Sequence, residues 1–221
     1  MPEITFRDIV ENHEIRTYIE RGNELLGVLG ITEHSLTHAA KVSQTASRIL
    51  IELGYSEREA ELAKIAGYIH DVGNVVNRVD HAQTGAVIAF NILTRLGMDP
   101  EEIATVTAAI GNHDEGTGSA VNTVSAALIL ADKGDVRRSR VRNHDFATFD
   151  IHDRVNYAVE SSAIHVDRQK KSVLLDMKID TRICSMIEYF EIFLDRMLMC
   201  RRAADFLKVK FELIINGTKI L

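Results

Sequence analysis

Histidines and aspartates recur at the ends of apolar segments in this chain of 221 residues. The stretch AGYIHDVGN (66–74) places His70 and Asp71 side by side after an apolar run, where an ionised carboxylate is normally unfavourable. His-Asp dipeptides also occur at 113–114, 144–145 and 152–153. The dipeptide is therefore not specific, and the periodicity of the neighbouring residues must decide which copies could do chemistry.

Six of these side chains fall on the apolar stripes of predicted helices. His38 shares a face with Val42 and Ala46, because residues three or four apart lie on one side of a helix. The other five side chains lie at the same helical spacing from apolar residues, each near a helix end. The set is His38, His70, Asp71, His81, His113 and Asp132. We expect these six side chains to meet in a common interior.

A buried cluster of this composition needs a positive charge, because burying an isolated carboxylate costs several kcal/mol. Since these stripes carry no lysine or arginine, we expect a metal, and imidazole and carboxylate ligands suit Mn, Fe, Co, Ni or Zn. Six ligands are too many for one catalytic ion with open positions. The charge of two divalent ions would be balanced by the two aspartates, a hydroxide and a phosphate group. We therefore predict two ions, bridged by Asp71.

Other polar residues near the cluster are candidates for substrate contacts. Lys133 and Arg78 could hold phosphate oxygens, Arg78 as a bidentate fork, or could be surface charges. Asp114 and Glu115 flank His113 and could act as a general base or support a ligand, or could be solvated. His34 lies one turn before His38 and could be the first ligand in its place, although the apolar stripe favours His38.

The helices expected to carry these residues have clear start and stop signals. Ser56 and Glu59 have the spacing of a capping box, and Asp99 precedes Pro100 at a first helical position. We predict helices over about 3–20, 32–54, 56–71, 80–96, 99–116 and 118–136, with a short helix and a turn over 23–31. These helices predict an all-helical body.

The pattern changes beyond residue 146. Residues 163–180 favour a hairpin, 181–206 an amphipathic helix and 210–217 a last strand. The sequence thus predicts a mainly α protein: a helical domain over 1–145 and a small α+β (ββαβ) C-terminal subdomain over 146–221. The His-Asp pairs at 144–145 and 152–153 lie in polar sequence and are expected to play no part in the site.

Composition restricts the function classes. Hydrophobic residues make up 46% and charged residues 26%, enough for a substantial core. The net charge of −6 disfavours binding to nucleic acid phosphates. We see no long apolar span or signal peptide, and Cys184 and Cys200 lack disulfide or zinc-finger spacing. A cytoplasmic protein without membrane contact is expected.

The six-residue pattern resembles the HD superfamily of metal-dependent phosphohydrolases, which has a lone His, a His-Asp pair and a distant Asp on a helical bundle. His81 in DHAQTGA and His113 in AIGNHDEG match the two histidines that its binuclear branches add. The resemblance covers about residues 32–142. Within the superfamily, the arrangement of these residues is similar to that in the HD diadenosine tetraphosphate hydrolases and in the HD part of ribonuclease Y. The GYP elements of the cyclic dinucleotide phosphodiesterases are absent from the sequence.

The resemblance implies hydrolysis of a phosphate monoester, diester or anhydride in a small phosphorylated substrate, and we expect a nucleotide. A homodimer is an open option. The alternative is a regulatory or interaction module that retains metal for structure, with the C-terminal subdomain as its partner or dimer surface. A nuclease action is disfavoured by the acidic balance.

Overall fold

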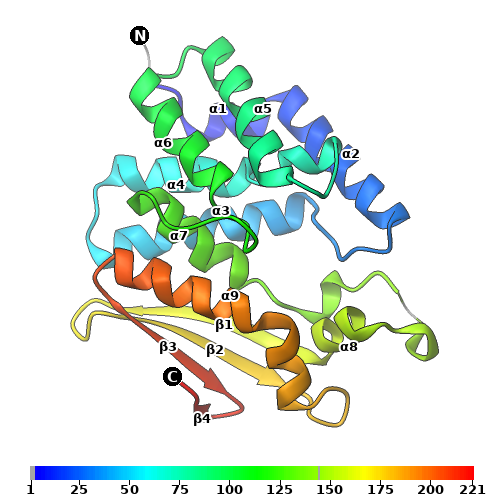
Figure 1. Cartoon of the computed structure of the whole chain (residues 1–221). Coiled ribbons are helices and arrows are strands. Elements are labelled where there is room, and N and C mark those ends of the chain that lie inside the picture. Colours follow the sequence, from blue (N-terminus) through cyan, green and yellow to red (C-terminus); the bar gives the residue numbers. More distant parts are fainter. Residues whose placement is uncertain (1–2, 144) are drawn as a thin grey trace.

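The computed structural model describes residues 3–143 and 145–221. Within them, helices form a body that stands above a sheet and its covering helix (Figure 1). The body contains α1 (Phe6–Glu11), α2 (His13–Val28), α3 (Leu36–Leu53), α4 (Glu57–Ile69), the 3-10 turn η1 (Val72–Val75), α5 (His81–Leu96), α6 (Pro100–Gly111), α7 (Thr123–Lys133) and the short turns η2 (Arg138–Arg140) and η3 (Phe146–Thr148). The predicted mainly helical fold is confirmed.

The C-terminal region adds a four-stranded sheet. It contains α8 (Ile151–Ala158), β1 (Val159–Asp167), β2 (Ser172–Ile179), α9 (Met186–Phe206), β3 (Lys210–Ile215) and β4 (Thr218–Lys219). The strand order is β1-β2-β3-β4, with β2 and β3 parallel and the outer pairs antiparallel. Helix α9 provides the crossover that a parallel pair requires. The chain as a whole is therefore not purely helical.

Two parts of the structure differ from the sequence-based expectation. Residues 3–28 form two helices, because the backbone of Asn12 is extended and its side chain accepts a hydrogen bond from the Ile15 amide, capping α2. Helix α2 also runs on to Val28, so the segment expected to be a separate short helix is its last part, and the turn follows at Leu29 and Gly30. Helix α8 was not predicted; it has only eight residues, of which Val155 and Ala158 are buried, so it shows no extended apolar stripe.

Other start and stop signals are confirmed. Ser56 and Glu59 form the reciprocal capping box that opens α4. The Asp99 side chain accepts from the amide of Glu101, with Pro100 as the first residue of α6. Gly54 ends α3 in the left-handed conformation, with φ of 90°. Local chemistry therefore fixes where these helices begin and end.

Two glycines allow the close packing that positions the site. A Cβ on Gly67 of α4 would lie 2.7 Å from the Cα of Ser43 in α3, and a Cβ on Gly73 would lie 2.0 Å from the carbonyl oxygen of His81. Neither distance is tolerable for a larger residue. The glycines thus let α3 and α4 pack closely, and let η1 pack against the start of α5.

Among the described residues, no helix combines the length and the apolar character required to cross a lipid bilayer.

Candidate metal centre

The six predicted side chains come together from five helices and the turn between two of them. His38 lies in α3, Asp71 precedes η1, and Asp132 lies near the end of α7. The other three are His70 at the end of α4, His81 at the start of α5 and His113 just after α6. The four histidines and Asp71 are buried, and the Asp132 side chain is 12% exposed. The expected convergence is thus present in the structure.

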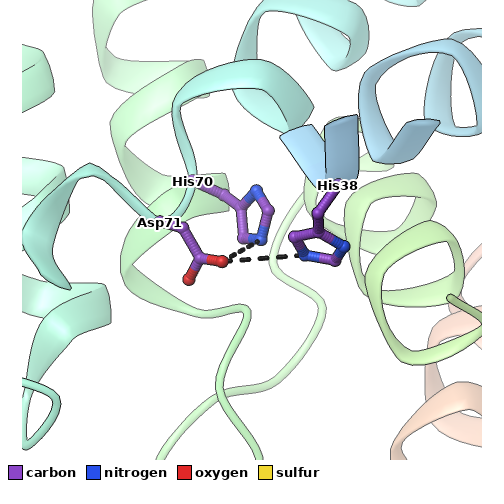
Figure 2. Close-up of side chains that lie close together, drawn as sticks. All are labelled: His38, His70 and Asp71. Atoms are coloured by element: carbon purple, nitrogen blue, oxygen red, sulfur yellow. Dashed lines mark ion pairs between the residues drawn. The ribbon is translucent and has the colours of Figure 1, made fainter. Parts of the chain in front are cut away.

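Asp71 lies at the centre of the cluster, and its two oxygens face different histidines. Its Oδ2 is 3.2 Å from His70 Nε2 and 3.6 Å from His38 Nε2 (Figure 2). Its Oδ1 is 3.5 Å from His81 Nε2 and 4.0 Å from His113 Nε2. This division is the arrangement required of a carboxylate that bridges two ions.

Asp132 completes one half of this arrangement. Its Oδ1 lies 3.3 Å from His38 Nε2 and 3.6 Å from His70 Nε2. On the other side, His81 Nε2 and His113 Nε2 are 3.2 Å apart. We call His38, His70 and Asp132 the first subsite and His81 and His113 the second subsite, with Asp71 shared by both.

All four histidines present Nε2 to the cluster because Nδ1 is engaged elsewhere. Nδ1 of His70, His81 and His113 lies 2.9, 3.0 and 2.6 Å from the carbonyl oxygen three residues earlier in each case. Nδ1 of His38 lies 2.8 Å from Asp135 Oδ2. A ring that donates from Nδ1 keeps the Nε2 lone pair free, which is the tautomer that binds metal.

The electrostatics show that the cluster needs positive charge. Burial is the largest single influence on the pKa of Asp71 and of Asp132 and raises both values. The neighbouring charges and hydrogen bonds, led by His70 for Asp71 and by Lys133 for Asp132, together outweigh burial and hold both pKa values well below the usual range. Burial lowers the pKa of His70, yet the two aspartates raise the pKa of His70 to about 10. Burial and the nearby His70 lower the pKa of His113 to about 3. Two buried carboxylates thus remain ionised and attract a cation.

The donor set fits a divalent metal. His38 Nε2, His70 Nε2 and Asp71 Oδ2 are buried without a hydrogen-bond partner, a costly state unless a ligand occupies the space between them. Three groups of possible ligand atoms, each within 4.8 Å of one another, cover all six residues. Ligands about 2.1 Å from one ion lie about 3.0–3.4 Å apart, close to the observed separations.

The two predicted phosphate-binding residues lie at the cluster. Lys133 is buried, with Nζ 2.9 Å from Asp132 Oδ2 and 3.0 Å from Glu115 Oε2. Burial lowers the pKa of Lys133, but Asp132 and Glu115 raise it above the usual value, so the amine stays charged. Arg78 Nη1 lies 3.3 Å from His81 Nε2 and 3.9 Å from Asp71 Oδ1, and its side chain is 29% exposed.

The remaining candidates lie outside the ligand groups. His34 stacks edge-on against His38, with ring centroids 5.5 Å apart, and donates from Nδ1 to the carbonyl oxygen of Thr32. Burial lowers the pKa of His34 well below its usual value. Asp114 follows His113 and is partly buried, but it does not line the cavity described next. His144 lies outside the described residues.

A cavity of about 340 Å³ opens onto the cluster. Its lining includes Asp71, His81, His113 and Asp132, together with the cationic side chains of Arg78, Lys133, Arg140 and Arg196. Residues of α8 also line it, among them His152 and Asp153, which the sequence placed outside the site. They belong to none of the ligand groups found in the described chain. The expectation that this pair plays no part in the site stays a prediction, and both residues border the cavity.

Sequence reasoning missed two residues that support the site: Asp135, which is buried against His38, and Arg196 of α9, whose Nε lies 2.5 Å from Glu115. Glu115, already a candidate from the sequence, pairs with Lys133 at 3.0 Å. Burial raises the pKa of Glu115, but Lys133 and Arg196 lower it to about 2. Asp135 follows Asp132 by three residues, on the same face of the helix predicted over 118–136, a signal that could have identified it. Arg196 has no such signal, because only tertiary packing brings α9 to the site.

Comparisons with known proteins agree with this geometry. The HD domain family matches residues 35–160, more than half of the chain. An uncharacterized protein of Methanocaldococcus jannaschii is 27% identical over 165 residues, covering 64% of this chain and 63% of that protein. Ribonuclease Y of Thermosipho melanesiensis is 28% identical over 162 residues, covering 71% of this chain and 31% of that enzyme.

The chain therefore spans less than two thirds of the length of each of these two relatives. Among solved structures, a predicted HD superfamily hydrolase from an uncultured Thermotogales bacterium is 26% identical with a TM-score of 0.44, covering 56% of this chain and 67% of that one.

Proposed function

The chain belongs to the HD domain family, and from this premise we propose that it is a metal-dependent phosphohydrolase that cleaves a phosphate ester or anhydride bond of a nucleotide. The observation that carries the proposal is the position of Asp71, whose two oxygens each face a different pair of histidines. A carboxylate placed in this way joins two subsites into one centre.

We infer that the centre holds two divalent ions, chosen among Mn, Fe, Co, Ni and Zn by ligand type. His38, His70 and Asp132 would hold one ion, His81 and His113 the other, and Asp71 both. Bound there, the ions would supply a hydroxide at neutral pH and polarise the phosphoryl group. The identity and the number of ions are part of the proposal.

The side chains around the centre have separate tasks in this proposal. The hydrogen bonds at Nδ1 hold the imidazoles in the metal-binding tautomer, so no reorganisation is needed when substrate arrives. Lys133 keeps Asp132 Oδ2 engaged, which directs Asp132 Oδ1 toward the first subsite. Arg78 lines the cavity beside the second subsite and carries a planar fork suited to phosphate oxygens.

The cavity supports a small substrate. A volume of about 340 Å³ is in the range of small-molecule pockets and suits a compound of about nucleotide size. Four cationic side chains in its lining favour a phosphorylated compound. The cytoplasmic location, the possible homodimer and the two-domain division at residue 145 remain predictions.

Ribonuclease Y among the relatives raises RNA as a second substrate class. We favour the smaller substrate because the net charge is −6, which opposes binding of a long polyanion, and because this chain covers only 31% of that enzyme. Hydrolysis of single-stranded RNA but not of nucleotides would reverse this preference. A regulatory module that retains metal without catalysis remains the alternative from another class.

The experiment combines metal analysis with a substrate screen. The purified chain is expected to contain divalent transition metal and to hydrolyse nucleotides, dinucleoside polyphosphates or sugar phosphates, and chelation should abolish activity while the fold survives. Asp71→Asn should lose metal and activity together, because no other group can serve both subsites. Asp176→Asn, on the exposed face of β2, is the matched control. An Asp71→Asn protein that keeps its metal and its turnover would refute the proposal, and a metal-loaded but inactive wild type would favour the regulatory module.

A further inference from the structure

The four histidines of the metal centre are not supported in the same way. His70, His81 and His113 each place Nδ1 against a carbonyl oxygen of their own chain segment, three residues earlier. His38 instead places Nδ1 2.8 Å from a side-chain carboxylate, Asp135 Oδ2, which lies 97 residues away in sequence. Among these four rings, the orientation of His38 alone thus depends on a distant side chain.

Asp135 is itself held firmly. Its side chain is 1% exposed, and its Oδ1 lies 2.7 Å from Lys41 Nζ and 2.9 Å from Arg137 Nε. Arg137 Nη2 also lies 3.2 Å from Oδ2. Two cationic side chains therefore hold the carboxylate in place beside His38.

We propose that Asp135 is a positioning residue that orients His38 for metal binding and makes the first subsite the tighter of the two. A buried carboxylate that accepts from Nδ1 fixes the tautomer and raises the basicity of Nε2. It also adds negative charge near the first subsite. The inference rests on the proposed metal centre.

The second subsite has the opposite electrostatic surroundings. Its histidines are supported by neutral carbonyl oxygens, and the guanidinium of Arg78 lies 3.3 Å from His81 Nε2 and 3.9 Å from Asp71 Oδ1. These two atoms would ligate the second ion. A cation entering there meets a positive charge and must displace Arg78 from His81. The ions therefore bind in sequence, first at His38, His70 and Asp132.

Asp135→Asn is the most informative variant because it changes the hydrogen-bond pattern and not the size. The Oδ1 position faces Lys41 Nζ at 2.7 Å and Arg137 Nε at 2.9 Å, whereas the Oδ2 position faces Arg137 Nη2 at 3.2 Å. The two shorter contacts favour the single amide oxygen of asparagine at the Oδ1 position. The amide nitrogen then faces His38 Nδ1 as a donor. This contact selects the tautomer with the proton on Nε2, which cannot bind a metal.

The test is a Co²⁺ titration of the full chain after its metal has been removed with a chelator. Calorimetry and the visible absorption of the bound ion monitor the binding. For wild type we expect two binding events of different affinity. In Asp135→Asn the tighter event should weaken by about 10- to 100-fold, with a changed Co²⁺ spectrum, while the weaker event persists. Lys41→Gln and Arg137→Gln are matched controls, since each removes an ion pair of Asp135 and leaves its contact with His38. Both controls should retain two events and the wild-type spectrum.

The outcomes separate this inference from the proposed function. If wild type binds no Co²⁺, the metal centre itself is refuted. If wild type binds Co²⁺ and Asp135→Asn binds it with unchanged affinity, or if both controls lose the tighter event equally, the role of Asp135 is refuted. A cooperative thermal unfolding transition of each metal-free variant shows that the variant is folded. Should Asp135→Asn fail to fold, nitrogen NMR of zinc-loaded wild type decides, since a His38 ring protonated at Nε2 would contradict the inference.

Discussion

The cavity is lined by two regions of the molecule that are built differently. The helical body supplies a ligand side, which consists of Asp71, His81, His113 and Asp132. The region after residue 146 supplies a C-terminal side, which consists of Asp150, His152, Asp153 and Asn156 near α8 and of Phe193 and Arg196 in α9. On the ligand side Asp71, His81 and His113 are buried, whereas on the C-terminal side Asp150 and His152 are exposed.

The two sides also differ in what fixes them. Histidines of the ligand side are oriented by carbonyl oxygens three residues away, so local helical geometry sets their direction. Arg196 is oriented by contacts distant in sequence, with Glu115 at 2.5 Å, and by its stacking 4.4 Å over the ring of Phe193. Within the proposed function, we therefore propose that the ligand side carries the chemistry and that the C-terminal side shapes substrate binding.

The largest expected effect is the loss of a ligand-side histidine. His113→Ala should lower kcat by about a thousandfold or more, because the second subsite loses one of its two histidines. Metal analysis should show fewer ions per chain, and steady-state kinetics should show the fall in kcat. Circular dichroism must first show that the variant folds, since His113 is buried. Near-normal kcat in a folded variant would contradict the assignment of chemistry to this side.

The ligand side could be predicted from the sequence because each residue lies on or beside a helix with its own apolar stripe. His113, for example, shares its face with Ile103, Val106 and Ile110, all buried as expected. Periodicity shows which face of a helix turns inward, and charge balance shows which inward residues are unusual. The same reasoning placed Asp71 between the two halves of the cluster.

The C-terminal side could not be predicted, because it lacks the apolar stripes that made the ligand side predictable. Helix α8 turns only two residues inward, and Arg196 lies in α9 as one charged residue among several. Its role depends on α9 packing against α7, a tertiary contact that no local pattern encodes. Asp135 is intermediate: its burial could have been suspected, but its partner His38 is 97 residues away.

A smaller effect is expected from Arg196→Gln. The variant loses the cation that pairs with Glu115 and lines the cavity, so KM should rise and kcat/KM should fall by about tenfold, while metal content stays unchanged. Arg201→Gln, on the exposed surface of the same helix, is the matched control. A loss of metal as large as that of His113→Ala would show that α9 belongs functionally to the ligand side.

A still smaller effect is expected at α8. His152 is exposed and lines the cavity, so His152→Ala should change KM by a few-fold and leave kcat, metal content and stability unaltered. His165→Ala, on an exposed position of β1 away from this cavity, removes a comparable histidine and serves as the control. Equal KM values in both variants would place the substrate against the ligand side alone. A strong fall in kcat would instead give α8 a part in the chemistry.

The smallest effect tests whether the C-terminal region is packed as firmly as the body. Cys200 of α9 is 1% exposed and lies in the same hydrophobic core as α7. Burial raises the pKa of the Cys200 thiol from 9.0 to about 12. Since the unfolded chain then releases its proton at lower pH than the folded chain, the contribution of Cys200 to stability is complete below pH 9 and is lost as pH rises toward 12.

Between pH 8.5 and pH 10, the free energy of unfolding of wild type should therefore fall by about 1 kcal/mol more than that of Cys200→Ala. Urea unfolding at the two pH values measures this difference, and the cavity left by the alanine cancels because each variant is compared with itself. The thiol of native protein should also resist alkylation at pH 8.5, since a protonated and buried thiol is a poor nucleophile. Identical pH dependence in the two proteins, with rapid alkylation, would mean that α9 separates readily from the body, and the C-terminal side could then not hold a fixed cavity shape.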